Sequence, residues 1–335
     1  MTFEKNSTAS TKLELLFHAD ETFSISNEGL RTGNKHAIYE KGVYKFRKDD
    51  GYAKNFAKQW KQFQTEQYDH INGTSLSRDR IADATKWNLE DMRGDLILEA
   101  GCGAGRFTRI LAESGANLVS FDYSSAVEVS QHMNGSFGNV SFFQADILNM
   151  PFKDNLFDRV FCYGVLQHTP DPYKSLDALI KKLKPGGWIS TDIYPRDFKL
   201  RPSKSKYFWR WLTTRMDQEK LMALLEWYIP RWFPYDTRIK KHSILRKYLG
   251  SIIPCWNYSH TNLPREDLIR WAVMDTFDAL APKYDKPAMK SQFFRWFKKL
   301  GLEEIEVRRG SNGIIGNGKK PRAFDQVGPK STNSP

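Results

Sequence analysis

Apolar and polar residues follow a repeating order in the middle of this 335-residue chain. Short apolar runs, which predict strands, lie at 96–98, 117–121, 140–145, 157–168 and 188–194. Between the first two runs, Phe107, Ile110 and Leu111 are spaced as on one face of a helix. Strands that alternate with helices in this way predict a doubly wound α/β sheet over residues 91–198.

The first 90 residues show two other patterns. Residues 1–50 alternate apolar runs at 13–17, 37–39 and 43–46 with polar turns, which predicts a small antiparallel β unit. In residues 51–90, Phe56, Trp60 and Phe63 are spaced to share one face of a helix. The spacing by itself is explained by a helix that packs its apolar face against the rest of the protein.

The C-terminal third departs from the alternating order. Residues 199–268 form a basic, aromatic stretch that predicts a helical insertion after the fifth strand. An amphipathic helix at 289–300 and two strands at 303–308 and 313–316 then predict the end of the core, over 269–318. The polar tail, 319–335, is expected to be disordered.

Glycine occupies every second position after the first strand of the core, at Gly101, Gly103 and Gly105. Without Cβ atoms, such a loop lets a ligand lie against the main chain at the carboxyl end of the strand. A dinucleotide fingerprint would need a small residue where Arg106 stands, and a phosphate loop would need Gly-Lys-Ser/Thr. The spacing therefore disfavours both kinds of phosphate site.

Acidic residues stand at or near the ends of three successive strands. Glu99 precedes the glycines, Asp122 follows the second strand and Asp146 follows the third. An acid about 20 residues beyond the first glycine can accept hydrogen bonds from ribose hydroxyls. Any one of these acids could instead cap a loop, but features at four strand ends in register favour a ligand site.

On these residues the chain resembles the class I S-adenosylmethionine-dependent methyltransferases, whose first motif has the form Glu-x-Gly-x-Gly-x-Gly. The segment 157–172 resembles the family's fourth motif, and 183–188 resembles the helix stop and turn before its fifth strand. The resemblance implies a Rossmann-like, seven-stranded sheet with helices on both faces, and S-adenosylmethionine as cofactor. It implies these cofactor-binding residues: Glu99, Gly101, Cys102, Gly103, Gly105, Asp122, Tyr123, Asp146, Ile147, Tyr163, Gly164 and Gln167.

The N-terminal unit resembles the small ribbon placed ahead of some bacterial methyltransferases of sugars and related metabolites, in which the following helices form a lid. Relatives of that ribbon bind zinc through cysteine pairs, whereas this chain has no cysteine before Cys102. We therefore expect no metal site. The other cysteines, Cys162 and Cys255, are far apart, so the three fit a reducing compartment and not a disulfide framework.

The net charge of +12 points to an anionic partner, such as nucleic acid, an anionic membrane surface or an acidic substrate. Residues 199–250 carry 13 Lys and Arg against 4 Asp and Glu, together with four tryptophans. This mixture suits stacking on bases, carbohydrate binding or an interfacial helix on anionic lipid. It equally suits a helical cap with its own aromatic core, and its place above the sheet assigns it to substrate recognition.

No targeting or membrane-spanning segment is expected. The N-terminus lacks the apolar core of a signal peptide, and no stretch approaches the roughly 18 apolar residues that a spanning helix needs. The sequence therefore predicts a cytoplasmic protein.

Methyl transfer from a sulfonium mainly requires that the acceptor be held about 3 Å from the methyl carbon. A base is needed only for an acceptor such as a hydroxyl, which is protonated at neutral pH. His168, at the mouth of the expected cleft, is the candidate base, although it could instead cap the turn or line the methionine pocket. Further candidates for holding an acceptor are Asp275, Asp278, Tyr284, Tyr194 and Arg196.

The expected function is methyl transfer to a small-molecule acceptor, namely a sugar, nucleotide-sugar, lipid-linked or related metabolite, with oxygen as the favoured atom. The alternative is an RNA methyltransferase that binds nucleic acid through the basic insertion. The Asn/Asp-Pro-Pro-Tyr/Phe signature of many base-amine methylating relatives is absent after the fourth strand, which disfavours the alternative. A third hypothesis, a non-catalytic scaffold, predicts a damaged cofactor site, and the site is intact in sequence.

Overall fold

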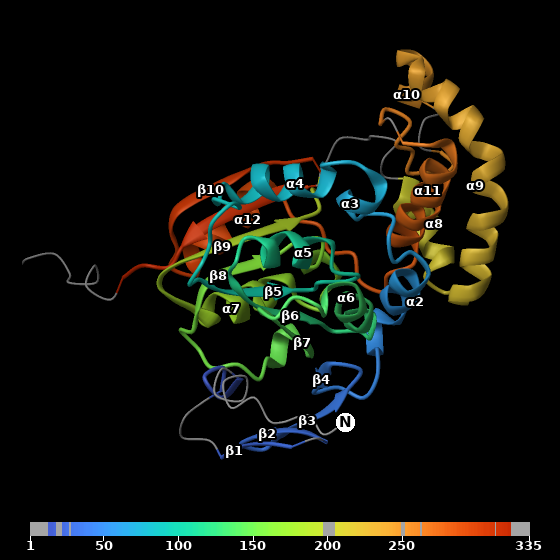
Figure 1. Cartoon of the computed structure of the whole chain (residues 1–335). Helices are drawn as coiled ribbons and strands as arrows, with labels where there is room; N and C mark the ends of the chain where they lie inside the picture. The colour runs from blue at the N-terminus through green and yellow to red at the C-terminus, as the bar shows by residue number, and fades with distance from the viewer. Residues whose placement is uncertain are drawn as a thin grey trace, which may run out of the picture.

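The computed structural model describes residues 13–17, 22–26, 28–196, 205–248, 252–261, 263–311 and 313–322. Within these residues one sheet runs through the molecule, in the order β1-β2-β3-β4-β7-β6-β5-β8-β9-β11-β10 (Figure 1). Its strands are β1 (Phe23–Ile25), β2 (Gly29–Thr32), β3 (Lys35–Glu40), β4 (Val43–Lys45), β5 (Leu96–Ala100), β6 (Asn117–Asp122), β7 (Val140–Gln144), β8 (Phe157–Cys162), β9 (Leu183–Ile193), β10 (Glu303–Arg309) and β11 (Ile314–Lys319).

Helices connect these strands and extend the molecule at one end. Those of the sheet region are η1 (Gly51–Ala53), α2 (Lys54–Gln62), α3 (Asp69–Asn72), α4 (Leu76–Thr85), α5 (Arg106–Glu113), α6 (Ala126–Asn134), η2 (Ile147–Asn149), η3 (Leu166–His168), α7 (Pro172–Lys182) and α12 (Lys290–Lys299). Between β9 and α12 lie α8 (Ser205–Thr213), α9 (Gln218–Lys241), α10 (Ser243–Tyr248) and α11 (Arg265–Leu280). The last of these crosses residue 268, the expected end of the insertion, and packs with α9.

Parallel pairing places the loops that follow β5, β6, β7 and β8 at the same edge of the sheet. The strands β4, β7, β6, β5, β8 and β9 are parallel neighbours, and β11 and β10 close the sheet in antiparallel pairing. From β5 the chain moves outward through β6 to β7, and then returns to β8 on the other side of β5. The glycine loop after β5 therefore lies at the topological switch point, where open α/β sheets bind their ligands.

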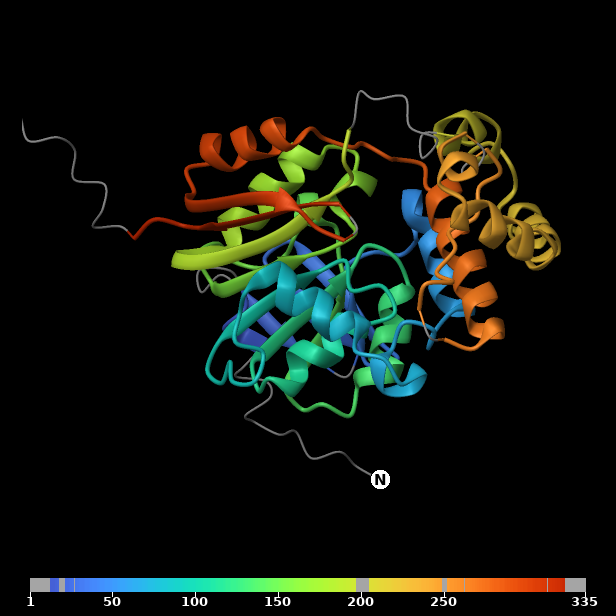
Figure 2. The same cartoon turned by 90° about the horizontal axis from the view of Figure 1, so that it is seen from above.

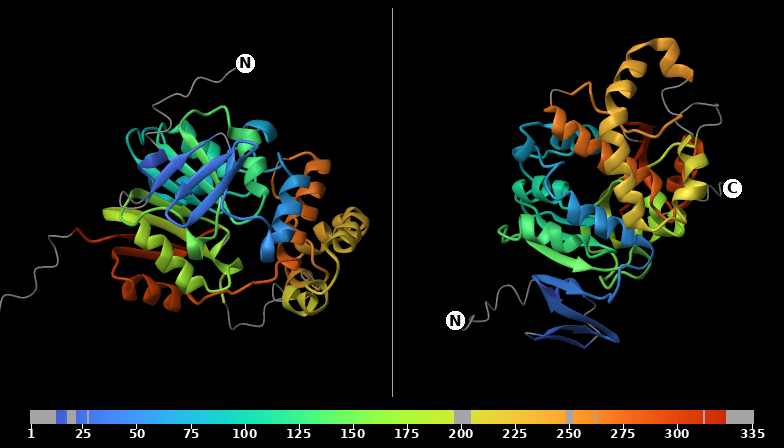
Figure 3. Two further views of the ribbon diagram at one scale, coloured as in Figure 1. Left: turned by 90° about the horizontal axis from the view of Figure 1, so that it is seen from below. Right: turned by 90° about the vertical axis from the view of Figure 1, so that its right-hand side faces the viewer.

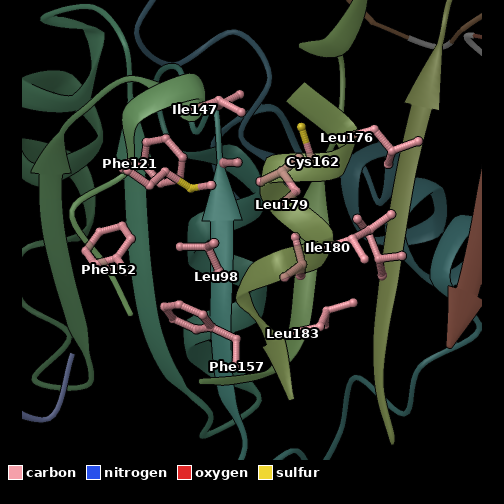
Figure 4. Close-up of a cluster of buried hydrophobic side chains, with 14 of the residues drawn as sticks. Leu98, Phe121, Ile147, Phe152, Phe157, Cys162, Leu176, Leu179, Ile180 and Leu183 are labelled. Atoms are coloured by element: carbon pink, nitrogen blue, oxygen red, sulfur yellow. The ribbon is translucent and has the colours of Figure 1, made fainter. Parts of the chain in front are cut away.

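Alternating side chains of the central strands fill a core on each face of the sheet. Leu98 of β5 packs with α7 on one face, while its neighbour Ile97 packs with α4 and α5 on the other. Figure 4 shows the first of these cores, in which Phe157 and Leu183 lie close to Leu98. Helices thus cover both faces of the sheet, as the resemblance implied, and hold the edge loops in place (Figure 2).

The sheet of the described residues has eleven strands, so the expected count of seven is not confirmed for the sheet as a whole. Seven of them, β5 to β11, come from the core, and the N-terminal unit adds four. The N-terminal strands β1 to β4 form an antiparallel unit that continues the main sheet, since Val43 and Tyr44 of β4 pair in parallel with Phe142 and Phe143 of β7. An uncovered β7 would present unpaired backbone groups to solvent, and β4 satisfies them. Residues 13–17 form a turn and no strand, and Phe17 packs against Phe23.

Two further expectations are corrected near the C-terminal edge. Residues 183–187, expected as a turn, belong to β9, where four residues bulge between the pairs Phe157–Leu183 and Arg159–Trp188. The expected disordered tail begins too early, because Lys319 is the last residue of β11. The main chain of Lys320 also exchanges hydrogen bonds with that of Gly186 and Gly187, at 2.7 and 2.9 Å. Residues 323–335 lie outside the described residues.

The insertion forms a second core beside the sheet (Figure 3). Asp217 starts α9 as its N-cap by accepting hydrogen bonds from the main chain of Glu219 and Lys220. The inner faces of α9 and α11 pack together and against Phe63, which directly follows α2. No helix of the described residues is long and apolar enough to cross a membrane.

Candidate functional site

The loops at the carboxyl edge of the sheet enclose a cavity of about 1200 Å³ together with α2 and α11. The glycine loop after β5 and the ends of β6 and β8 form its floor, and Phe56, Trp60 and Phe63 line it from α2 and the residue that follows. This volume exceeds the roughly 300–1,000 Å³ of a typical small-molecule site. The cavity is therefore larger than one typical small ligand requires.

A buried hydrogen-bond network fixes the glycine loop from below. The hydroxyl of Tyr68 donates to the carbonyl of Ala104 at 2.6 Å. The amide of Asn134 donates to the carbonyl of Gly105 at 3.0 Å and to the Tyr68 oxygen at 2.9 Å. Gly105 has a φ of +94°, which a side chain rarely adopts. These hydrogen bonds hold the glycine loop in its present shape without any ligand.

Asp122 ends β6 beside this loop and lines the cavity. One carboxylate oxygen accepts a hydrogen bond from the main-chain N–H of Gly103 at 3.0 Å. The other accepts from the N–H and the hydroxyl of Ser124, each at 2.8 Å. Desolvation raises the pKa of Asp122, and these hydrogen bonds oppose that rise. A carboxylate has about four acceptor positions, so Asp122 retains capacity for a ligand hydroxyl.

The structure brings most of the predicted cofactor residues together. Nine of them line the cavity: Gly101, Cys102, Gly103, Gly105, Asp122, Tyr123, Ile147, Tyr163 and Gly164. Three do not. Glu99 lies buried beneath the loop, and the Asp146 carboxylate accepts a hydrogen bond from the N–H of Leu148 at 2.9 Å. Gln167 is fully buried, and its amide has no hydrogen-bond partner among the described residues.

Glu99 has its own structural role under the loop. Its carboxylate accepts hydrogen bonds from the hydroxyls of Thr108 at 2.7 Å and Ser120 at 2.8 Å. Burial raises the pKa of Glu99 to about 7, and these two hydrogen bonds oppose the rise. The folded protein thus binds this proton more tightly than the unfolded chain does.

The free energy of unfolding is expected to fall as the pH rises from about 4.5 to about 7, and this contribution of Glu99 then levels off. The sign follows because the folded state binds more protons in that window. Each pH unit costs about 1.4 kcal/mol, roughly 3 kcal/mol in total. Denaturant unfolding of the wild type and of Glu99→Gln at pH 5 and pH 8 tests this. Between the two pH values, the free energy of unfolding of the wild type should fall by about 3 kcal/mol relative to that of the variant. An equal gap at both pH values would contradict it.

His168 lies on the cavity wall at the end of η3. Its Nδ1 is 3.0 Å from the main-chain oxygen of Tyr284. A carbonyl oxygen only accepts hydrogen bonds, so Nδ1 carries the proton and Nε2 of the neutral ring keeps a lone pair. Nε2 is buried and has no partner among the described residues. The rings of Phe56 and Tyr194 pack edge-on against the imidazole, at 5.0 and 5.4 Å between centroids.

The cavity wall formed by α11 carries two carboxylate–phenol pairs. The hydroxyl of Tyr258 donates to Asp275, and the hydroxyl of Tyr194 donates to Asp278 at 3.1 Å. Burial raises the pKa of Asp275 to about 7, opposed by the Tyr258 hydrogen bond. Of the acceptor candidates from the sequence, Asp275, Asp278, Tyr194 and Arg196 line the cavity, whereas Tyr284 contributes only its main-chain oxygen to His168.

Sequence reasoning missed three polar residues of this wall: Tyr258, Arg80 and Arg106. Arg106 was read only as the residue that breaks a dinucleotide fingerprint. Burial lowers the pKa of its guanidinium to about 9. An arginine at the first helical position after a glycine loop could have been recognised as facing a ligand. Tyr258 lies more than 150 residues from the loop, and Arg80 lies outside the motif, on α4.

The cavity residues fit S-adenosylmethionine. Gly101 and Gly103 have φ values of +77° and +55°, so the loop presents its main chain without side chains in the way. Asp122 offers carboxylate oxygens for hydroxyls, and Ile147 offers an apolar surface at the end of β7. Among the described residues, no group of three or more His, Cys, Asp or Glu side chains could hold a metal ion.

This fold and site are those of a Rossmann-like α/β domain with a ligand cavity at the carboxyl edge of its sheet. Residues 98–191 match the family model described as methyltransferase domain. The chain therefore contains an S-adenosylmethionine-dependent methyltransferase domain, built on β5 to β9 and the helices between them.

Curated relatives resemble the same region. A demethylmenaquinone methyltransferase of Clavibacter sepedonicus is 35% identical over 125 residues, covering 36% of this chain and 51% of that protein. A ubiquinone biosynthesis O-methyltransferase of Nitrosospira multiformis is 31% identical over 101 residues, covering 29% and 42%. A sterol 24-C-methyltransferase of Saccharomyces cerevisiae is 33% identical over 114 residues, covering 30% of each chain. The match thus spans about half or less of the length of these relatives.

Solved structures also resemble the chain over a wider range. A SAM-dependent methyltransferase from Aquifex aeolicus has a TM-score of 0.41 at 12% identity, covering 78% of this chain and 96% of that one.

Replacing Asp122 by alanine is expected to weaken cofactor binding by about 1.5–3 kcal/mol, the scale of a hydrogen bond to a charged group. Calorimetric titration with S-adenosylmethionine measures the change as a 10- to 150-fold rise in Kd. Asp91→Ala, which removes an exposed carboxylate before β5, is the matched control and should bind as the wild type does. An unchanged affinity of the Asp122 variant would remove the assignment.

Proposed function

We propose that this chain transfers a methyl group from S-adenosylmethionine to a hydroxyl oxygen of a small-molecule acceptor, with His168 as the general base. The acceptor class is a sugar, nucleotide-sugar, lipid-linked or related metabolite. Bound S-adenosylmethionine supplies a methyl group activated by a sulfonium, which an acceptor oxygen takes in an in-line displacement. Asp122, Ile147 and the loop of Gly101 to Gly105 are the residues that would hold it.

The orientation of His168 carries the proposal. Because the Tyr284 carbonyl fixes the proton on Nδ1, the unpartnered Nε2 is ready to accept a proton. A buried acceptor atom without a donor is costly unless a ligand satisfies it. A hydroxyl of the acceptor supplies that donor and loses its proton to Nε2 as the oxygen attacks. Phe56, packed against the imidazole from α2, must shift to admit the acceptor, which gives α2 the role of a lid.

The α11 wall then orients the acceptor. The carboxylates of Asp275 and Asp278 and their partner phenols can hydrogen-bond several hydroxyls of a polar substrate. Relatives named as ubiquinone biosynthesis O-methyltransferases give independent support for oxygen as the methylated atom. The assignment of residues 199–268 as a substrate cap and of 51–90 as a lid belongs to the same proposal.

The finer family assignment is also part of the proposal. We place the chain among the bacterial sugar and small-metabolite methyltransferases with an N-terminal ribbon that lacks zinc cysteines. Its support is the antiparallel unit of β1 to β4. A cytoplasmic location is supported by the three buried, free cysteines, which suit a reducing compartment.

The test is to incubate the purified chain with methyl-labelled S-adenosylmethionine and a fractionated cell extract. We expect base-stable label in small polar or lipid-linked compounds, as an ether would give. Label in RNA would replace this proposal by the alternative, an RNA methyltransferase. Binding of the cofactor without transfer to any fraction would favour the non-catalytic scaffold and overturn the proposed function.

A further inference from the structure

Large apolar side chains are exposed on α8, α9 and α10. Phe208 and Trp211 of α8 are 74% and 71% exposed, and Trp227 of α9 is 60% exposed. We call the whole set the basic aromatic surface. It comprises Phe208, Trp211, Leu212, Arg215, Lys220, Leu224, Trp227, Arg231, Tyr235, Arg238, Ile244 and Leu245, all of them exposed.

The helix α9 has two apolar faces, and only one of them is covered by the described residues. Its inner face is buried in the second core through Leu221, Leu225, Ile229 and Phe233. On the outer face, Leu224, Trp227, Arg231 and Tyr235 follow each other at intervals of three and four residues and stay exposed. The outer face of a globular helix is normally dominated by charged and polar residues. Figure 1 shows α9 at the rim of the molecule, far from β10.

Arginine side chains accompany the exposed tryptophans. The guanidinium of Arg215 lies 5.3 Å from the Trp211 ring centre, and that of Arg231 lies 5.1 Å from the Trp227 ring centre. Each arginine also donates a hydrogen bond to the main-chain oxygen of its tryptophan. The stacked pairs therefore present a flat aromatic ring and a positive charge side by side.

The four acidic residues within 199–250 do not neutralise this surface. Asp217 accepts main-chain hydrogen bonds as the N-cap of α9, and Glu219 pairs with Lys58 at 3.8 Å. Glu226 accepts a hydrogen bond from Gln62 of α2. Asp236 is buried and pairs with Lys240 at 2.8 Å. The basic aromatic surface thus keeps a net positive charge.

We propose that the basic aromatic surface docks this protein on the surface of an anionic lipid bilayer. Helices with aromatic and aliphatic side chains among Lys and Arg lie in the membrane interface, where rings enter the headgroup region and cations meet lipid phosphates. Such a contact is peripheral, and no helix of the described residues could span the bilayer. The docking is independent of which molecule the cavity methylates.

The composition of the surface favours lipid over its two rivals. Nucleic acid binds by stacking on aromatic rings, which gives Leu212, Leu224, Ile244 and Leu245 no partner. A second copy of the chain would meet the same surface across a two-fold axis, and would bring arginines and lysines against each other. Like charges in contact disfavour such an interface. Only an anionic apolar boundary satisfies both kinds of side chain.

The surface also adjoins the cavity. Lys206 and Tyr207, at the start of α8, line the cavity, whereas the next residue, Phe208, belongs to the basic aromatic surface. A docked bilayer therefore lies beside the cavity wall that α8 provides.

Sedimentation with vesicles tests the proposal without any cofactor or acceptor. The full chain is mixed with vesicles of phosphatidylcholine containing about one third phosphatidylglycerol, and with pure phosphatidylcholine vesicles. We expect binding to the anionic vesicles that weakens with added salt, and at least about tenfold weaker binding to the neutral ones. Trp211→Ser/Trp227→Ser should lose at least about tenfold in vesicle affinity, and Arg231→Gln about fivefold.

Matched controls come from exposed residues at the other end of the molecule. Phe294→Ser and Lys299→Gln change an exposed aromatic and an exposed cation of α12, and should bind vesicles as the wild type does. Circular dichroism and thermal unfolding verify that each variant is folded. A wild type that stays in the supernatant, or tryptophan variants that bind normally, would overturn the proposal. So would a surface-dependent dimer in sedimentation velocity, or tight binding of a 30-nucleotide RNA without vesicle binding.

Discussion

Replacing His168 by alanine is expected to lower kcat for methyl transfer by about 10²- to 10⁴-fold, the usual contribution of a general base. The alanine removes the proton acceptor whose orientation the Tyr284 carbonyl fixes. The rate of the variant should rise with pH, because a hydroxide-deprotonated acceptor no longer needs the base. The measurement is transfer of labelled methyl to the acceptor fraction across a pH series, beside calorimetric titration of S-adenosylmethionine.

Cofactor affinity should change by less than about twofold, since the predicted effect lies in proton transfer. His168→Gln keeps a side-chain amide in the same place and cannot accept the proton, so it should be as slow as His168→Ala. His132→Ala, an exposed histidine on α6, is the control and should keep full activity. A His168→Ala rate within about threefold of the wild type would exclude the histidine as a base.

Replacing Gly105 by alanine should destabilise the folded protein by about 2–5 kcal/mol and abolish cofactor binding. At a φ of +94° a side chain is strained by about 1–2 kcal/mol. A Cβ there would also lie 2.3 Å from the Ser130 hydroxyl and 2.5 Å from the Asn134 amide. Overpacking of this kind costs about 1–3 kcal/mol. The same Asn134 amide holds the loop through the Gly105 carbonyl, so relief of the clash would displace the cofactor loop.

Gly138→Ala is the matched control, because a Cβ at that glycine meets no atom within 4 Å and its φ is not positive. Urea unfolding gives the difference in stability, and calorimetry gives cofactor binding. A Gly105→Ala variant as stable as Gly138→Ala, with intact binding, would show that the Tyr68–Asn134 network does not fix the loop.

The strands of the cofactor core could be predicted because local patterns specify them. Apolar runs at regular intervals correspond to β5, β6, β7 and β8, and the alternating glycines correspond to the loop at the switch point. The spacing of Asp122 from that loop placed its carboxylate in the cavity. Each strand, the loop and the spacing from Gly101 to Asp122 involve residues within about 30 positions of each other. This is the length of one βαβ unit, so local sequence is enough to specify each of them.

Glu99 shows where local reasoning was insufficient. Its position in the motif marks it as a ligand-facing acid, but alternation of side chains along β5 turns it toward Thr108 and Ser120. A similar limit applies to residues 183–187, whose Pro-Gly-Gly composition is typical of a turn. Hydrogen bonds of Gly186 and Gly187 with Lys320, more than 130 positions away, draw them into β9 instead.

By itself, the sequence determined the class of domain, the order of its central strands, the glycine loop and the acid that follows β6, because each depends on neighbouring residues. Only the tertiary structure decided that β4 extends the sheet along β7, that Tyr258 pairs with Asp275, and that the Tyr284 carbonyl sets the proton on His168. The longest of these contacts, between His168 and Tyr284, joins residues 116 positions apart. The contacts form because packing of whole helices and strands, and no local pattern, brings those side chains together.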